Sequence, residues 1–298
     1  MKILYITNHK TIQQAGGYVN DYLNDLVFHG LHDLLGEGRI SELVDSTPIE
    51  HLYKENAKGF DTNVLWGLGF SSSFLIEGDG SSVNRADIPL KIKDRYFDRV
   101  IYGSCTRCLE YYDIVSKYYE NRSVVMLDGE DHTVLSSHLL QHPYFKRELL
   151  PENVTENIRP ISFGMPLCKF MLPNKNKNLD YATIVPGIPG TYVYDNEADY
   201  YTGYSNSYYG MTMKKSGWDC MRHYEILASY SMPFFLMLSE CPETILANFP
   251  KDLVLRGMEL VSNFSSEDYY SIMDELYAYA QEKLTTKAVA NYVLESVL

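Results

Sequence analysis

The sequence predicts an α/β protein with a parallel sheet, because short apolar strands alternate with helices along the first half of the chain. Residues 3–7 form a β-type run, and residues 21–35 follow with apolar side chains at helical spacing. The same order returns as a strand at 99–103, a helix at 109–119 and a strand at 123–127. A strand, a crossover helix and a second strand in succession are typical of a parallel sheet.

Each of these first elements can be justified from its own residues. Gly36 ends the first helix, whose apolar residues are Tyr22, Leu26, Val27, Leu31, Leu34 and Leu35. A Gly-Ser turn follows the strand at 99–103. The run at 123–127 is apolar throughout, which indicates a buried strand.

Two polar segments follow predicted strands and are therefore candidate ligand loops. Residues 8–20 come after the first strand, and residues 128–132 come after the strand at 123–127. Ligands of open parallel sheets bind outside the carboxyl ends of the strands. We therefore expect the side chains of these two segments to line a binding site.

The second half begins after a polar stretch without periodicity at 173–178, which predicts a domain boundary and divides the chain into 1–170 and 171–298. A strand is expected at 181–185, and a tyrosine-rich polar stretch without an assigned structure covers 199–209. The remaining expected elements are a helix at about 220–230, a strand at 233–235, and helices at 268–285 and 286–298.

Composition limits the classes of function. The chain has 298 residues, 45% of them hydrophobic and 22% charged, as expected for a globular protein without extended disorder. A net charge of -13 argues against a broad nucleic-acid surface but permits a local basic groove. No apolar run reaches the length of a membrane span, and the start resembles a strand rather than a signal peptide. We expect a cytoplasmic protein, or one in the host cytoplasm if the chain is viral, with five reduced cysteines.

The segment 214–228 concentrates the residue types that bind an anionic ligand. Gly217 permits close approach of the backbone, and a helix beginning near Cys220 presents unpaired N–H groups to a phosphate. Lys214 and Lys215 precede that helix and can neutralise a diphosphate. The alternative is that both lysines are simply solvated.

Three further side chains of this segment lie on the predicted helix. Arg222 can grip a phosphate through two N–H groups, and Glu225 can accept hydrogen bonds from ribose hydroxyls. We include His223 between them as a donor-side residue. The alternative is that Arg222 and Glu225 form a surface pair within one helical turn.

This segment, from Lys214 to Ala228 with the following Met-Pro-Phe-Phe at 232–235, resembles the donor-binding region of GT-B-type glycosyltransferases. The resemblance implies two Rossmann-like domains facing a cleft, with an acceptor-side domain at 1–170 and a nucleotide-sugar-binding domain at 171–298. It also implies that Glu225 binds the ribose of a nucleotide diphosphate sugar, most simply a UDP-sugar, with Lys214, Lys215 and Arg222 on the diphosphate. No obligatory metal is implied.

The whole chain is also similar to poorly characterised bacterial and phage glycosyltransferase-like proteins. The matching segments are 21–31, 128–132, 145–148 and the stretch 214–235. Retaining members of the superfamily often carry an acid eight positions before the ribose-binding glutamate, where this chain has Gly217. The resemblance therefore implies inversion at the sugar and a general base in the first half.

Several residues of the first half are candidates for this base or for acceptor binding. Asp25 and His29 lie four positions apart on one predicted helix face. Asp131 and His132 follow a buried strand. We predict Asp25, Asp131 and His132 as catalytic residues and His29, together with His9, as acceptor-binding residues. The alternative for the helix pair is a solvated position near the helix start.

Three other functions are compatible with the sequence. The acceptor can be a glycan, a small molecule or a hydroxymethylated pyrimidine in DNA, and the last would make the chain a phage-type DNA base glycosyltransferase. A binding protein for nucleotide sugars or glycans would keep the fold without the base. Finally, Cys105 and Cys108 stand after a strand at a helix start, where a thiol redox pair would lie.

Overall fold

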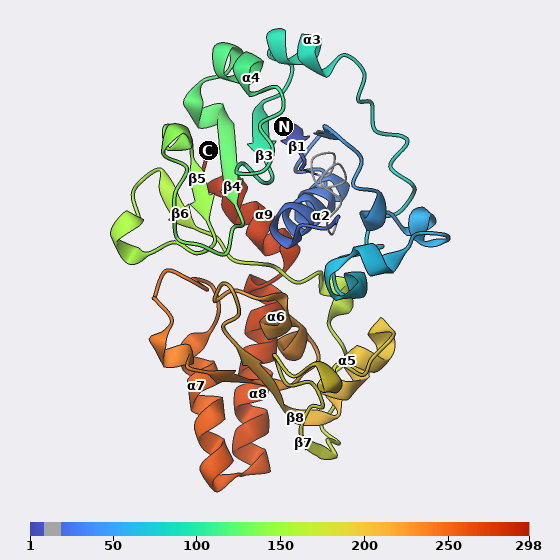
Figure 1. Ribbon diagram of the computed structural model, residues 1–298, viewed down its shortest axis with the longest axis vertical. Coiled ribbons are helices and arrows are strands. Elements are labelled where there is room, and N and C mark those ends of the chain that lie inside the picture. Colours follow the sequence, from blue (N-terminus) through green and yellow to red (C-terminus); the bar gives the residue numbers. More distant parts are fainter. Residues whose placement is uncertain (9–18, 298) are drawn as a thin grey trace.

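A computed structural model describes residues 1–8 and 19–297 and confirms the α/β class with a parallel sheet (Figure 1). Within these residues, six parallel strands form one sheet in the order β2-β1-β3-β4-β5-β6, and three parallel strands form a second in the order β7-β8-β9. The strands are β1 Lys2–Ile6, β2 Glu42–Asp45, β3 Arg99–Tyr102, β4 Val124–Asp128, β5 Tyr144–Lys146, β6 Ile158–Pro160, β7 Leu179–Tyr181, β8 Ser207–Met213 and β9 Met232–Leu236.

The strand order of the large sheet reverses between β1 and β3. β1 pairs with β2 on one side and with β3 on the other, so the segments after β1 and β3 diverge to opposite sides. Such a switch point is where open α/β sheets receive ligands. The strands expected at 3–7, 99–103 and 123–127 are β1, β3 and β4.

The first helix, α2 Tyr22–Gly36, agrees with the expected helix at 21–35. Asp21 caps it, because its carboxylate accepts a hydrogen bond from the Asn24 N–H at 3.3 Å. Two shorter helices follow in the first half, α3 Ile88–Lys93 and α4 Tyr112–Tyr118. α4 begins later than the sequence predicted because Tyr111, which precedes it, adopts φ 62°.

The second half contains two helices that the sequence left unassigned, α5 Glu197–Ser205 in the tyrosine-rich stretch and α7 Lys251–Glu259. The expected helix at 220–230 is α6 Met221–Ala228, and the expected strand at 233–235 is β9. The strand expected at 181–185 is displaced to β7, Leu179–Tyr181. The last helices are α7 Lys251–Glu259, α8 Ser266–Lys283 and α9 Thr286–Glu295.

Helix α9 leaves the second half and packs against α2 (Figure 1). A Cβ on Gly30 would lie 2.1 Å from the backbone oxygen of Thr286, so only glycine permits this approach of the two helices. The hydrophobic core that includes α2 and α9 continues from Ile3 to Tyr269 and Leu294 without interruption. No helix within the described residues has the length and apolar character needed to cross a membrane.

Candidate functional site

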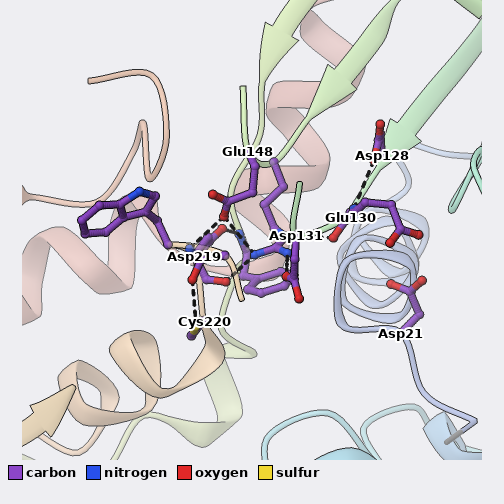
Figure 2. Close-up of polar contacts among 12 residues, drawn as sticks. Asp21, Asp128, Glu130, Asp131, Glu148, Asp219 and Cys220 are labelled. Carbon is purple, nitrogen blue, oxygen red and sulfur yellow. Dashed lines mark hydrogen bonds and ion pairs between the residues drawn. The ribbon is translucent and has the colours of Figure 1, made fainter. Parts of the chain in front are cut away.

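The carboxyl ends of β4 and β5 meet the loop that follows β8, and Asp131, Glu148 and Asp219 lie close together there (Figure 2). Arg147 joins them through its hydrogen bonds. Arg147 is only 2% exposed. Its Nε donates to the Gly129 carbonyl at 3.0 Å, and its other nitrogens donate to the Asp219 carbonyl, to Glu148 at 3.3 Å and to Asp131. We call this contact, made by Arg147, Asp131, Glu148 and Asp219, the charged junction.

Asp219 fixes the loop from the other side. Its N–H donates to Glu148 Oε1 at 3.0 Å, and its carboxylate accepts from the Phe163 N–H at 2.9 Å and the Tyr224 hydroxyl at 2.8 Å. Burial raises the pKa of Asp219 to about 6, and the neighbouring Arg147 opposes that rise. The loop before α6 is therefore held rigidly against the end of β5.

The structure explains the glycine at position 217 by a contact within the protein, whereas we expected the close approach of a ligand. A Cβ at this position would lie 2.6 Å from Glu148 Oε1 and 3.1 Å from Asp131 Oδ1. The absence of a side chain thus makes room for two carboxylates of the first half, whereas we expected it to make room for a ligand.

The basic residues of the loop are accessible. Lys214 and Lys215 are exposed, and the Lys214 ammonium lies 5.1 Å from the centre of the Trp218 ring. The Cys220 side chain makes no capping hydrogen bond at the start of α6. Arg222 lies on the first turn, where its guanidinium is 5.5 Å from the Tyr192 ring. The anion-binding role of these groups stays a prediction.

His223 is used inside the protein. Its Nε2 lies 2.8 Å from the Trp218 carbonyl, its Nδ1 lies 2.8 Å from the Thr212 hydroxyl, and its ring stacks on Phe235. Burial lowers its pKa to about 3. Because both ring nitrogens are engaged within the protein, neither is available to a bound nucleotide sugar.

Glu225 is also enclosed, and the charge of Arg222 lies near its hydroxyl partners. Oε1 accepts from Ser71 at 2.6 Å, and Oε2 accepts from Tyr200. Burial raises the pKa of Glu225, and these two hydrogen bonds oppose the rise. We call the contact of Glu225 with Ser71 and Tyr200 the hydroxyl junction, since Ser71 belongs to the first half and the other two residues to the second.

Two first-half candidates lie within the core. Asp25 is fully buried, and its carboxylate accepts from the Asp21 N–H at 3.0 Å and pairs with His51 at 2.8 Å. His29 bonds through Nδ1 to the Thr286 hydroxyl at 2.9 Å, and burial lowers its pKa to about 4. The contact of His29 therefore joins α2 to α9.

The other first-half candidates differ in accessibility. Asp131 and His132 are exposed beyond the end of β4, and Asp131 is oriented by Arg147. His9 lies outside the described residues. The structure brings Asp131 next to Gly217, so one predicted catalytic residue and the predicted donor loop do meet.

Sequence reasoning predicted Asp131 and Glu225 but missed most of the other residues that make these junctions. Arg147 and Glu148 belong to the segment 145–148 and received no role, although their place directly after β5 was a usable signal. Arg107, which bonds Asp21 at 3.2 Å and Glu130 at 2.7 Å beside the switch point, carried no local signal. Ser71 carried none either.

The remaining clusters are separate from this region. Burial raises the pKa of the Cys105 thiol, which is the opposite of the shift that activates a redox cysteine. A surface hollow of about 520 Å³ extends from Pro48 to Arg85 and is lined by none of the predicted site residues. Within residues 1–8 and 19–297, no group of three or more His, Cys, Asp or Glu side chains is placed to hold a metal ion.

The fold and the charged junction define a Rossmann-like α/β protein with polar groups at the carboxyl ends of parallel strands. No protein-family model matches the chain, and no curated protein matches its sequence.

Proposed function

We propose that the chain is a glycosyltransferase that moves a sugar from a nucleotide diphosphate sugar, most simply a UDP-sugar, to a hydroxyl acceptor. One observation carries the proposal: the basic loop after β8 lies against the carboxyl ends of β4 and β5 through Arg147 and Asp219. An anion-binding loop is thereby brought beside acidic side chains of the large sheet, which are the two parts that such a transfer needs. Two Rossmann-like lobes with the substrate between them belong to the proposal.

In this mechanism the donor diphosphate lies at the start of α6, where Lys214 and Lys215 neutralise it. An acceptor hydroxyl attacks the anomeric carbon from the side opposite the diphosphate. The bond between that carbon and the diphosphate oxygen breaks, the diphosphate keeps the electron pair, and the configuration inverts. Glu225 accepts hydrogen bonds from the ribose.

Asp131 is the general base that we propose for the acceptor hydroxyl. Among the predicted catalytic residues, Asp25 is fully buried and engaged by His51, while Asp131 is exposed beside the donor loop. Arg147 orients its carboxylate. Asp131 takes the proton of the hydroxyl as the new bond forms, and exposed His132 is the next residue along the chain.

Incubation of the protein with a panel of nucleotide sugars tests the proposal through release of free nucleoside diphosphate. We expect release from at least one donor, and faster release when a glycan, a small alcohol or hydroxymethylated DNA is the acceptor. Asp131→Asn should lower turnover about 100-fold at unchanged donor affinity, and Asp113→Asn, at an exposed aspartate of α4, is the control. Binding of a donor without turnover would instead identify a nucleotide-sugar-binding protein.

A further inference from the structure

We infer that residues 66–74 form a latch in which the Ser71 hydroxyl occupies the place of a ribose hydroxyl on Glu225. The inference rests on the proposed function and adds a conformational step to it. In the free protein Ser71 closes the nucleotide site, and a bound ribose diol takes over its hydrogen bond to the carboxylate.

The contacts of Ser71 are those of a bound hydroxyl. Its Oγ donates to Glu225 Oε1 at 2.6 Å and lies 2.6 Å from the Tyr201 hydroxyl. Its N–H donates to Glu197 Oε1 at 2.7 Å. A ribose hydroxyl binds a carboxylate through the same O–H donor at the same range of distance.

The carboxylate is enclosed in this closed form. Glu225 is 6% exposed, Ser71 donates to Oε1, and Tyr200 donates to Oε2. A ribose diol can therefore reach the carboxylate only if one of these two partners moves away. Tyr200 belongs to helix α5, while Ser71 belongs to a loop, so Ser71 is the partner that can be released.

The backbone of the latch is held in a costly conformation. Ser71 adopts φ 69°, and Leu68 and Phe74 adopt φ 57° and 53°, all in the left-handed region that non-glycine residues avoid. Such residues persist only where surrounding contacts hold them, and they concentrate at ligand clamps and switch regions. Here the contacts that hold Ser71 are its bonds to two buried or half-buried acids.

The two ends of the latch are anchored to the first half, while the side-chain hydrogen bonds of its middle, among residues 1–8 and 19–297, run within the latch or to the second half. Trp66 N donates to Asn20 Oδ1 at 2.7 Å, and Phe74 N donates to the His51 carbonyl at 2.8 Å. Between them, the Ser72 hydroxyl is buried without a hydrogen-bond partner among the described residues. Release of Ser71 can therefore open the middle while both anchors remain.

Binding of uridine diphosphate to the wild type and to Ser71→Ala tests the latch. Removal of the hydroxyl leaves Glu225 Oε1 without its donor in the free protein, and the ribose restores that donor. We expect Ser71→Ala to bind uridine diphosphate about tenfold more tightly. Ser231→Ala is the matched control: this hydroxyl is equally buried and donates to the Ser207 carbonyl at 3.0 Å.

Hydrogen exchange of the wild type gives a second measurement that does not depend on a variant that folds. The latch predicts faster amide exchange over residues 66–74 when uridine diphosphate is bound. If the nucleotide binds but exchange in 66–74 is unchanged, or if Ser71→Ala binds it no better, the latch is wrong and the proposed function stands. If neither protein binds any nucleoside diphosphate, both are wrong.

Discussion

The charged junction and the hydroxyl junction both join the first half of the chain to the second, but with opposite chemistry. At the charged junction, Arg147 pairs with Asp131 and Glu148 and binds the backbone of Asp219. At the hydroxyl junction, the buried Glu225 accepts hydrogen bonds from the hydroxyls of Ser71 and Tyr200, and the charge of Arg222 lies nearby. Loss of one partner from a buried ion pair leaves an uncompensated charge, whereas a neutral hydroxyl can be exchanged for another hydroxyl at small cost.

We interpret the charged junction as a permanent contact and the hydroxyl junction as an exchangeable one. The charged junction holds the loop before α6 against the large sheet, and the proposed latch makes the hydroxyl junction a position that a ligand hydroxyl can take. The predictions below test this contrast, beginning with the largest expected effect.

Arg147→Met should lower the free energy of unfolding by about 3–5 kcal/mol, because it leaves Glu148 and the Asp219 carbonyl buried without their cation. Urea denaturation measures this value. Arg39→Met is the control, since the Arg39 side chain is 48% exposed in its pairing with Glu295, and we expect a change below about 1 kcal/mol. Equal losses in the two variants would remove the distinction between the charged junction and a surface pair.

Glu148→Gln and Glu225→Gln compare the two junctions through one chemical change. Glu148 accepts from Arg147 and from the Asp219 N–H, so neutralisation should cost about 2–3 kcal/mol of unfolding free energy. Glu225 accepts from the hydroxyls of Ser71 and Tyr200, and its neutral substitute should change stability by about 1 kcal/mol or less. A larger loss for Glu225→Gln in urea denaturation would contradict the contrast.

Acid should lower the stability of the folded protein through His223, which contacts the loop before α6 at the Trp218 carbonyl. The pKa of this histidine is about 3 in the folded protein because of burial, against roughly 6.5 when unfolded. Protons therefore bind the unfolded chain preferentially between these values, so the stabilisation is complete above about pH 6.5 and decreases as the pH falls toward 3.

Between pH 6.5 and 5 this histidine should account for a loss of about 2 kcal/mol. Denaturation at both pH values measures it in the wild type and in His223→Gln, which should lack this component. His138→Gln, at an exposed histidine, serves as the control and should keep the wild-type pH dependence. A pH profile that His223→Gln leaves unchanged would show that the buried ring does not titrate in this way.

Lys214→Ala should have the smallest effect on folding, within about 0.5 kcal/mol, because the side chain is exposed. Its affinity for uridine diphosphate should nevertheless fall several-fold, since a cation near the diphosphate is lost. Lys117→Ala is a close control, because this exposed ammonium also lies over an aromatic ring, 5.7 Å from that of Tyr118. Equal nucleotide affinities in both variants would remove Lys214 from the donor site.

The elements that sequence reasoning found have strong local signals. β1, β3 and β4 are short and almost continuously buried runs, and α2 carries apolar side chains at helical spacing. Helix α6 buries seven of its eight residues, polar ones included. Helix α5 was missed because its buried face consists of Tyr200, Tyr201 and Tyr204 within a polar stretch that has no clear apolar period. β7 is short and exposed, so burial leaves little trace of its position in the sequence.

The candidate site was predictable only where chemistry is local. The loop with Lys214 and Gly217 stood out because its residues are neighbours in the chain. Ser71 and Glu225 are 154 positions apart, and Arg147 reaches the Asp219 carbonyl across 72 positions. No spacing rule links such residues, because their contact depends on how the two sheets pack.

The packing of α9 on α2 has a consequence for the synthesis of the protein. α2 is made early, yet the surface around Gly30 packs against a helix that begins at Thr286. While the ribosome completes the intervening residues, the nascent chain carries an uncovered apolar surface beside β1, the kind of surface that chaperones bind and that favours aggregation. The first sheet can therefore reach its final packing only after the last helix has left the ribosome.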